Sequence, residues 1–432
     1  MEKISNKEKI SYGFGSMAYN IANASLATFI LPFYQTFGVE MYRNIFIIIT
    51  ISKVFDALTD IPVGLLIDKT NSKWGKSRPY MLFLAIPFAV IVSAVFYKPD
   101  FDNSLWIYIY IIITFNLFLL LYTGVFLSHS TLNMQITDNT KQRMYLNIFR
   151  VLGGFIVTII MNIITLPLVN NESIGWWKIW TGYGIIGTLF FLICFAGTKE
   201  RVTTPNNYTL KNLPQAITKN YVISLVSYTF LIMKRLLLVV PAVFFCGSWF
   251  SNPGLVGLFT AAFMMPMMVA LCFAPKFFKM EKAKLIIYTN IIYIISYGTI
   301  LAFGLLTNNI PLPLMIACLV INGISMAPHE VLAFPLFMDV IEENFEKKNI
   351  RIEGPVYSGS AIVRKIGEGL VFLLTGTLTL AYVTSVDASS PILNSKPILL
   401  LFILIPVSIS LVNVIILKLY RNEHELKNLK KL

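Results

Sequence analysis

The sequence predicts an all-α membrane protein in which twelve transmembrane helices form two six-helix bundles around a central cavity. Its composition and the placement of its basic residues lead to this prediction. Hydrophobic residues make up 56% of the 432 residues and charged residues 13%, with a mean hydropathy of +0.70. Soluble domains carry about 25% charged residues. A soluble chain of this composition would therefore expose large apolar patches.

The apolar segments have the length that the hydrocarbon core of a bilayer requires. A helix needs about 20 residues to cross it, and a window of that size finds twelve candidates. We expect helices over residues 11–36, 43–66, 80–97, 104–134, 146–169, 179–197, 221–246, 254–274, 285–306, 312–338, 355–382 and 397–418.

Basic residues are distributed unevenly between the two sides of these helices. Most of the 35 Lys and Arg residues lie in the N-terminus, the loops after even-numbered helices and the C-terminal tail. Loops after odd-numbered helices hold only Arg43, Lys98, Lys178 and Lys396. Because basic residues accumulate on the cytoplasmic side, we expect cytoplasmic termini in a multi-pass protein of a bacterial inner or plasma membrane. The net charge of +13 then reflects topology and does not indicate nucleic-acid binding.

One long polar segment divides the chain. It runs from Thr198 to Asn220 and is rich in Lys, Asn, Thr and Pro, which is typical of a linker. We expect an N-terminal bundle over 1–198, a cytoplasmic linker over 199–220 and a C-terminal bundle over 221–432. Two such bundles can work by alternating access, and because the fold needs no partner we expect a monomer.

Two aspartates interrupt the second apolar segment. Asp56 and Asp60 are four residues apart and share one helix face. An ionised Asp near the bilayer centre costs roughly 2.5–3.5 kcal/mol, and two of them repel each other. Such a face is tolerable where it binds a cation, a proton or a basic partner. We expect a site for H⁺ or Na⁺ that includes the Thr59 hydroxyl. In the alternative, Lys53 or Lys365 neutralises the pair permanently and transport is uncoupled.

Two adjacent basic residues lie near the middle of the seventh predicted helix. Lys234 and Arg235 are too far from either end, about 15 Å, for their side chains to reach water easily. They form either an anion clamp together with Arg150 or a charge pair with Glu330 or Glu368.

The eleventh predicted helix raises a similar question. Arg364 and Lys365 stand four and three residues before Glu368, a spacing that favours pairing within the helix. Alternatively, Lys365 reaches Asp56 or Asp60 and releases it when the ion binds, which would couple ion and solute.

A basic loop and two histidines complete the set of candidates. The loop DKTNSKWGKSRPY, residues 68–80, is expected to form a gate in which Asp68 and Arg78 pair in one conformation. Asp339 is a further gating candidate. His129 and His329 are either satisfied hydrogen-bonding groups or proton relays.

Four segments of the chain resemble a family of transporters. They are KVFDALTDIPVGLLIDKTNSKWGKSRPY (53–80), KISYGFGSMAYNIA (9–22), TDNTKQRMYLNIFRVLGG (137–154) and MDVIEENFEKKNIRIEGPVYSG (338–359). They are similar to the glycoside-pentoside-hexuronide:cation symporters, the melibiose-permease branch of the major facilitator superfamily. The similarity covers most of the chain at low identity, and the first segment is its most specific part.

The resemblance implies a symporter fold and roles for four residues. Asp56 and Asp60 match two carboxylates that help to bind the coupling Na⁺, Li⁺ or H⁺ in that family. Lys365 matches a lysine near the cation site, and Arg150 matches an arginine that takes part in sugar binding.

The chain departs from the family where the sugar is held. Asn20 and Phe126 stand where the family has aspartates. Ser130 falls near the position of its aromatic sugar platform, and Glu330 falls near that of a tryptophan. The resemblance therefore implies a symporter but not a galactoside as its solute.

The leading hypothesis is a symporter for a small polar solute, sugar-like or anionic, driven by H⁺ or Na⁺ with no other cofactor. Candidate solute-binding residues are Tyr19, Asn20, Arg150, Lys234, Arg235 and Glu330. An uncoupled facilitator is one alternative. A lysolipid or amphipathic-anion transporter is another, because Asn20 and Phe126 make the expected cavity less acidic. A membrane-embedded transferase is disfavoured, because the sequence has no GxxxxGK[ST], HExxH or GxSxG motif for nucleotide, metal or nucleophile chemistry.

Overall fold

The computed structural model describes residues 4–171, 173–202, 217–271, 273, 277, 280–348, 353–385 and 396–420. Within these ranges the chain forms helices and short connections, and no strand occurs there. The chain divides into two compact units, Met1–Asn206 and Asn207–Leu432. The division falls inside the segment 199–220 that the composition predicts to be a linker.

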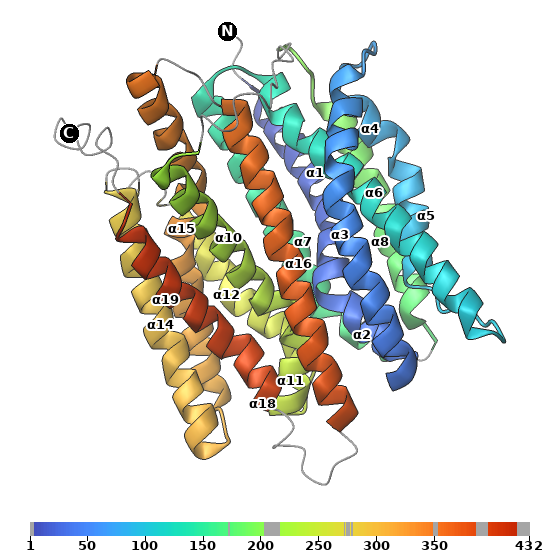
Figure 1. Ribbon diagram of the computed structural model, residues 1–432. Helices are drawn as coiled ribbons and strands as arrows, with labels where there is room; N and C mark the ends of the chain where they lie inside the picture. The colour runs from blue at the N-terminus through green and yellow to red at the C-terminus, as the bar shows by residue number, and fades with distance from the viewer. Residues whose placement is uncertain are drawn as a thin grey trace. The chain divides into compact units, whose positions relative to one another are not determined.

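Unit 1 starts with a helix that a π-helical turn interrupts. Its elements are α1 (Asn6–Ala24), the π turn η1 (Ser25–Phe29), α2 (Ile30–Gln35), α3 (Val39–Lys69), α4 (Arg78–Phe83), α5 (Ala85–Val95), α6 (Ser104–Ile136), α7 (Thr140–Val169) and α8 (Gly175–Gly197). Side-chain oxygens of Ser5, Asn103 and Asn139 cap the starts of α1, α6 and α7. α3 runs beside α6, and α1 packs against α7 and α8 (Figure 1).

The two sides of α3 differ in polarity. The side chains that it exposes over its central and last turns are large and apolar, and they recur at the spacing of one helix face: Ile51, Phe55, Leu58, Leu65 and Leu66. Ser52 and Asp56 lie buried on the opposite side. In a bilayer an apolar face turned outward meets acyl chains, and polar groups face the protein interior. α3 therefore holds its carboxylates away from lipid.

Small residues let α1 approach α7 closely. A Cβ atom at Gly153 on α7 would lie 2.7 Å from the carbonyl oxygen of Gly13 on α1. A Cβ atom at Gly154 would lie 2.8 Å from the side-chain nitrogen of Asn20. Such stripes of small residues allow helix backbones to come together in membranes. They also place Asn20 directly against α7.

Replacing Gly153 by Val is expected to destabilise unit 1 by about 1–3 kcal/mol, because overpacking forces two backbones apart. The melting temperature in detergent should fall by several degrees. Gly182→Ala on α8 is the matched control, since no atom lies within 4 Å of the added Cβ. An unchanged melting temperature for Gly153→Val would contradict the close approach of α1 and α7.

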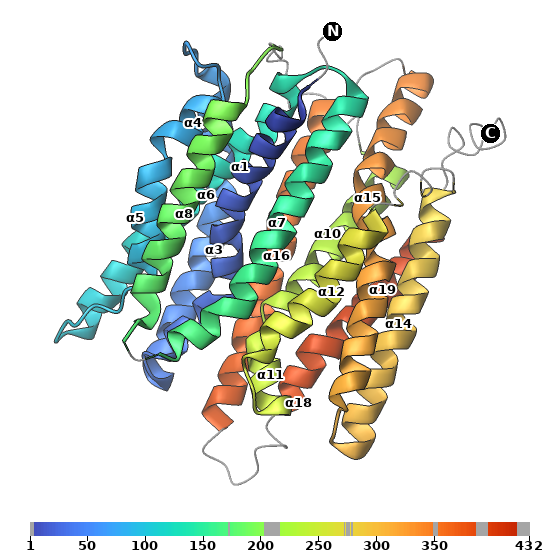
Figure 2. The same ribbon diagram turned by 180° about the vertical axis from the view of Figure 1, so that it is seen from behind.

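Unit 2 contains the second set of helices. Its elements are α10 (Lys219–Val239), α11 (Ala242–Phe250), α12 (Leu255–Leu271), α14 (Lys282–Thr307), α15 (Leu312–Lys348), α16 (Glu353–Ser385), α18 (Lys396–Leu399), the π turn η3 (Leu400–Leu404) and α19 (Ile405–Leu417). α15 packs against α12 and α14 (Figure 2). α10 packs against α15, α16 and α19. Buried Ile223, Ile286, Leu332 and Leu417 join α10, α14, α15 and α19 in one core.

Seven helices in the described ranges have the length and apolar composition to cross a membrane. They correspond to the predicted spans that begin at residues 104, 146, 179, 221, 285, 312 and 397. The predicted total of twelve is not confirmed. Among the other five, η1 interrupts the first span, Leu84 separates α4 from α5, and α12 has 17 residues. The span that begins at residue 43 lies in α3, which carries Lys53, Asp56 and Asp60 within a few turns. The last of the five lies in α16.

Candidate functional site

Asp56 and Asp60 converge on a single hydroxyl group. The Thr123 hydroxyl on α6 lies 3.2 Å from one carboxylate oxygen of Asp56 and 3.2 Å from one of Asp60. These two oxygens are therefore at most twice that distance apart. Thr123 has one hydroxyl proton and can donate it to only one of them at a time. With Asp56 only 2% exposed, the arrangement favours a shared proton or a bound hard cation.

Hydrogen bonds along the α3–α6 interface hold this pair in register. The Asn44 side chain donates to the Tyr108 hydroxyl at 2.9 Å, and the Asn116 side chain donates to the Ser52 hydroxyl at 2.9 Å. Both pairs have a separation of 64 residues along the chain, so the two helices run parallel. Thr123 and the acidic pair continue the same row. Interhelical hydrogen bonds of this kind position membrane helices.

The other two residues predicted for the cation site belong to different units of the chain. The Thr59 hydroxyl donates to the Asp56 carbonyl oxygen in its own helix at 2.9 Å. Lys365 is buried on α16 in unit 2. Within the described residues no group of three or more His, Cys, Asp or Glu side chains is placed to hold a metal ion.

The candidate solute-binding residues of unit 1 meet at the α1–α7 contact. The Ser16 hydroxyl donates to the Arg150 carbonyl oxygen at 2.6 Å and ties the two helices together. The Asn20 side-chain nitrogen donates to the Ser16 carbonyl oxygen at 2.8 Å, and the Tyr19 hydroxyl lies 3.3 Å from the Ser16 hydroxyl. The structure thus brings Tyr19 and Asn20 to the part of α7 that carries Arg150.

An aromatic cluster lies beside these residues. Tyr19 meets Phe126 edge to face at a centroid distance of 5.3 Å, and Phe126 stacks on Tyr122 at 5.8 Å. Phe126, where the resembling family has an acid, is therefore part of an aromatic wall. Planar apolar faces of this kind suit the C–H face of a sugar ring.

His129 packs within the same cluster. Its ring stacks on Tyr12 at 4.1 Å, and Nε2 donates to the Tyr12 carbonyl oxygen at 2.8 Å. The Tyr12 hydroxyl donates back to the His129 carbonyl oxygen. These contacts satisfy Nε2, whereas Nδ1 is buried without a hydrogen-bond partner among the described residues, so both interpretations of His129 stay open.

Lys234 and Arg235 have separate partners in unit 2. Lys234 is 2% exposed; its ammonium donates to the Asn290 side chain at 2.7 Å and lies 5.0 Å from the centre of the Tyr293 ring. Arg235 forms an ion pair with Glu330 on α15 at 3.0 Å. For Arg235 the structure therefore contains the charge pair that was one of the two alternatives.

Three further candidates of unit 2 also have partners. His329 lies 3.1 Å from the Ser227 hydroxyl through Nε2. Arg364 pairs with Glu368 within α16, the local pairing that their spacing favours. Asp339 binds the Lys282 ammonium through both carboxylate oxygens, at 2.8 and 2.7 Å.

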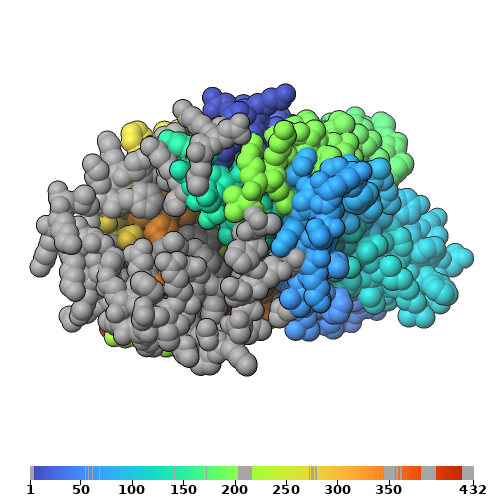
Figure 3. All heavy atoms as spheres, turned by 90° about the horizontal axis from the view of Figure 1, so that it is seen from above, coloured from blue at the N-terminus to red at the C-terminus, as the bar shows by residue number. Residues whose placement is uncertain are grey.

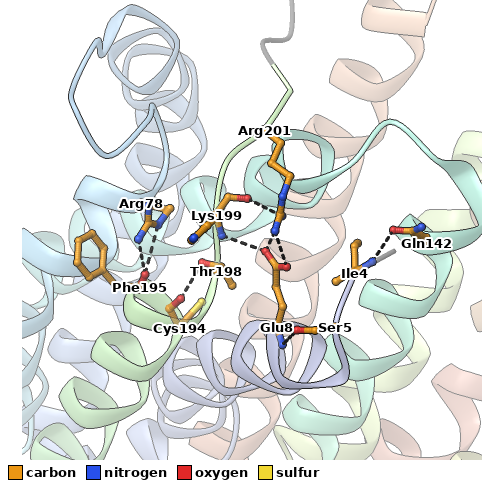
Figure 4. Close-up of polar contacts among 10 residues, drawn as sticks. All are labelled: Ile4, Ser5, Glu8, Arg78, Gln142, Cys194, Phe195, Thr198, Lys199 and Arg201. Carbon is orange, nitrogen blue, oxygen red and sulfur yellow. Dashed lines mark hydrogen bonds and ion pairs between the residues drawn. The ribbon is translucent and has the colours of Figure 1, made fainter. Parts of the chain in front are cut away.

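The predicted gate falls at one end of unit 1, where the segment after α8 lies against the loop between α3 and α4 (Figure 3). Arg78 donates to the Phe195 carbonyl oxygen through Nε and Nη2, at 3.2 and 2.6 Å, and lies over the Phe195 ring (Figure 4). Burial lowers the pKa of Arg78 from its usual value, and Glu200 partly offsets this. The side chain of Asp68 lies outside the described residues.

Glu200 fixes the loop between α3 and α4, where the sequence predicts a gate. Its carboxylate accepts the backbone N–H groups of Lys76, Ser77 and Arg78 at 2.8, 2.9 and 2.9 Å. Gly75 makes room for it: φ is +106°, and a Cβ atom there would overlap the carboxylate. A negative charge at these N–H groups also interacts favourably with the start of α4.

Glu8 secures the same segment from the other side. Its carboxylate binds the Arg201 guanidinium in bidentate fashion at 2.8 and 3.0 Å and accepts the Lys199 N–H at 3.0 Å (Figure 4). The Arg201 and Val202 N–H groups donate to the Gln135 carbonyl oxygen on α6. Residues 198–202 thus bind the ends of α1, α4, α6 and α8 together.

Glu200→Ala is expected to lower the free energy of unfolding by about 2–4 kcal/mol, because it leaves three backbone N–H donors without their charged acceptor. Lys199→Ala is the matched control, since only the Lys199 backbone takes part. Thermal unfolding of both variants in the same detergent checks this. Equal melting temperatures for the two variants would contradict the role assigned to Glu200.

Sequence reasoning missed Thr123 and Glu200. A hydroxyl residue within the apolar run LLLYTGVF, residues 119–126, was the only signal for Thr123. Glu200 lies in a segment whose composition predicts a linker. In both cases the partner is distant in sequence.

Comparison with known proteins agrees with this architecture. A family model described as MFS/sugar transport protein matches residues 11–423. The uncharacterized symporter YnaJ of Bacillus subtilis (strain 168) is 34% identical over 214 residues, which cover 47% of this chain and 45% of YnaJ. The isoprimeverose transporter of Lactiplantibacillus pentosus is 25% identical over 410 residues, which cover 90% of this chain and 83% of the relative. The chain spans about half the length of several curated relatives that it matches.

The fold also has a counterpart among solved structures. The POT family transporter PepTSo superposes with a TM-score of 0.63 at 11% identity, and the match covers 99% of both chains. At this identity the similarity shows the fold alone, which is the all-helical fold of the major facilitator superfamily. The family match over most of the chain confirms the resemblance seen in the sequence and indicates a multi-pass membrane protein. The chain belongs to the MFS/sugar transport protein family, a family of transporters and not of enzymes.

Proposed function

We propose that this protein is a symporter that couples the transport of a sugar-like solute to H⁺ or Na⁺ by alternating access. One observation carries the proposal: Asp56 and Asp60 both lie 3.2 Å from the Thr123 hydroxyl, on a membrane helix whose outer face is apolar. Two carboxylates in such a place need positive charge. A cation that binds there only in some conformations biases the equilibrium between them and so couples its own gradient to the solute.

The solute is held by Tyr19, Asn20 and Arg150. An aromatic ring, an amide and a guanidinium supply an apolar face, hydrogen bonds and a charged donor, the combination that polar small-molecule sites use. The Phe126 ring beside Tyr19 extends the apolar face. The relative that carries isoprimeverose, a sugar, supports a sugar-like solute.

The remaining candidate residues act around this site. Lys365 exchanges partners with the acidic pair, and Asp68, Arg78 and Asp339 take part in gating. The proposal also includes a monomer with bundles over 1–198 and 221–432, a linker over 199–220, and both termini in the cytoplasm, where the basic loops belong.

Uptake into proteoliposomes tests the proposal. Labelled isoprimeverose, methyl-β-D-glucoside and methyl-β-D-glucuronide are offered with an inward H⁺ gradient, an inward Na⁺ gradient or equal ions on both sides. At least one sugar should accumulate several-fold above equilibrium under one gradient, and an ionophore should abolish this.

The other outcomes identify the alternatives. Sugar entry that stops at equilibrium under every gradient would indicate an uncoupled facilitator. No sugar uptake, together with transfer of a labelled lysophospholipid between leaflets, would indicate an amphipathic-solute transporter. Either result would overturn the proposed coupling.

A further inference from the structure

Arg235 is a partly exposed charged residue in the buried last part of α10. Over residues 231–240 Arg235 is the only residue that is not buried. Tyr228, two turns earlier on the same face, is also partly exposed. An aromatic ring and a guanidinium in one row suit a polar solute better than they suit lipid.

The ion pair at Arg235 leaves one acidic oxygen unsatisfied. A single contact joins the two side chains, Arg235 Nη1 to Glu330 Oε1 at 3.0 Å. Glu330 Oε2 is buried and has no hydrogen-bond partner. Guanidinium and carboxylate groups bind most strongly in a bidentate arrangement, and an unsatisfied buried acceptor costs about 1–3 kcal/mol. The Arg235–Glu330 pair is therefore weaker than a bidentate pair of the same two groups would be.

Two other ion pairs described in unit 2 differ from this one. Asp339 engages Lys282 through both oxygens, and these side chains are 10% and 13% exposed. Arg364 pairs with Glu368 inside one helix at 13% and 18% exposure. The Arg235 side chain is 28% exposed, more than the cations of those two pairs.

Other ionisable groups near α10 have partners of their own. On α10 itself Lys234 binds Asn290, and on α15 His329 binds Ser227. On α16 Arg364 binds Glu368, and Lys365 is buried. Among the ion pairs described between α10 and its neighbours, Arg235 with Glu330 is thus a partly exposed one.

We propose that Arg235 binds an acidic group of the solute, a carboxylate or sulfonate, and that Glu330 is an internal competitor that occupies Arg235 when no acidic solute is bound. This inference rests on the proposed function and names its substrate class as acidic sugars. A solute acid exchanges the single contact for a bidentate one. Glu330, once displaced in a membrane interior, takes up a proton, because an ionised carboxylate without its cation is costly there.

Binding measurements on purified full-length protein in nanodiscs test this. The probes are methyl-β-D-glucuronide, a glucoside with a 6-sulfonate group, and neutral methyl-β-D-glucoside. Arg235→Gln should lower the affinity for the acidic sugars at least 10-fold and change that for the neutral one less than 3-fold. Arg235→Lys, which keeps the charge, should recover part of the loss.

Glu330→Gln gives the decisive result, because removing the competitor should raise the affinity for the acidic sugars at least 5-fold at pH 8. In the wild type, protonation of Glu330 should raise the affinity for the acidic sugars between pH 8 and pH 6, and Glu330→Gln should abolish this increase. Glu368→Gln, which removes the acid of the α16 pair, is the matched control and should change neither quantity. Melting temperatures and size-exclusion profiles confirm that each variant is folded.

Three outcomes would overturn the inference: no binding of either acidic sugar to the wild type, equal losses for acidic and neutral sugars in Arg235→Gln, or weaker acidic-sugar binding in Glu330→Gln. Gradient-driven uptake of isoprimeverose or methyl-β-D-glucoside is measured in parallel. If it persists while the acidic sugars do not bind, the inference fails and the proposed symport function stands.

Discussion

Asp56→Asn and Asp60→Asn are each expected to abolish accumulation of the solute against its gradient. The solute should still equilibrate across the membrane in both variants. A hundredfold cation gradient supports up to ~100-fold accumulation of a neutral solute in one-to-one coupling. Each variant should reduce this to equal concentrations on both sides, because the amide cannot carry the charge that attracts the cation. Uptake into proteoliposomes under the gradient that drives the wild type measures this effect.

Solute exchange at equal ion concentrations separates loss of coupling from loss of folding. Both variants should retain exchange within a few-fold of the wild type. Asp102→Asn, at an exposed aspartate between α5 and α6, is the control and should accumulate solute normally. Undiminished accumulation by both Asp56→Asn and Asp60→Asn would show that the pair does not couple transport.

Thr123→Val is expected to weaken cation binding by about 10-fold or more. A hydrogen bond to a charged group contributes about 1.5–3 kcal/mol, and the Thr123 hydroxyl is within 3.2 Å of both carboxylates. Valine keeps the shape of the side chain and removes the oxygen. The cation concentration that gives half-maximal solute uptake is the quantity to measure.

Two further substitutions isolate the role of the Thr123 hydroxyl. Thr123→Ser keeps it and should stay near the wild-type value. Thr114→Val on the same helix removes a hydroxyl that bonds only to carbonyl oxygens of its own helix, at Tyr110 and Ile111, and should have little effect. If Thr123→Val behaves like Thr114→Val, the hydroxyl has no part in the cation site.

The acidic pair could be predicted from the sequence because its signal is local. Two aspartates four residues apart in an apolar run define a helix face whatever the helix packs against. Thr123 could not be predicted in the same way, since it is 63 and 67 residues from its two partners. Apolar membrane helices carry little information on which neighbour each one contacts, and here the α3–α6 hydrogen bonds supply it.

Distance along the chain also explains why the sequence does not decide between an ion pair and an anion clamp in unit 2. Spacing alone favours the Arg364–Glu368 pair, and the structure contains it. Arg235 and Glu330 are 95 residues apart, so only the packing of α10 on α15 distinguishes an ion pair from an anion clamp.

Interruptions and irregular segments are also hard to predict. A hydropathy window counts apolar residues and does not detect a π turn such as Ser25–Phe29. The polar segment after α8 has no periodicity, yet Glu200 and Arg201 bond to helix ends far away in sequence. Their role depends on tertiary contacts that periodicity does not encode.

The central claim is that the acidic pair on α3 carries the coupling ion together with the solute. The most direct measurement is cation movement driven by the solute: a downhill gradient of the transported sugar is imposed on proteoliposomes, and H⁺ or Na⁺ entry is followed with an internal dye. We expect uphill cation entry with the wild type and none with Asp56→Asn or Asp60→Asn, although the sugar still enters. Cation entry of wild-type size in both variants would contradict the account.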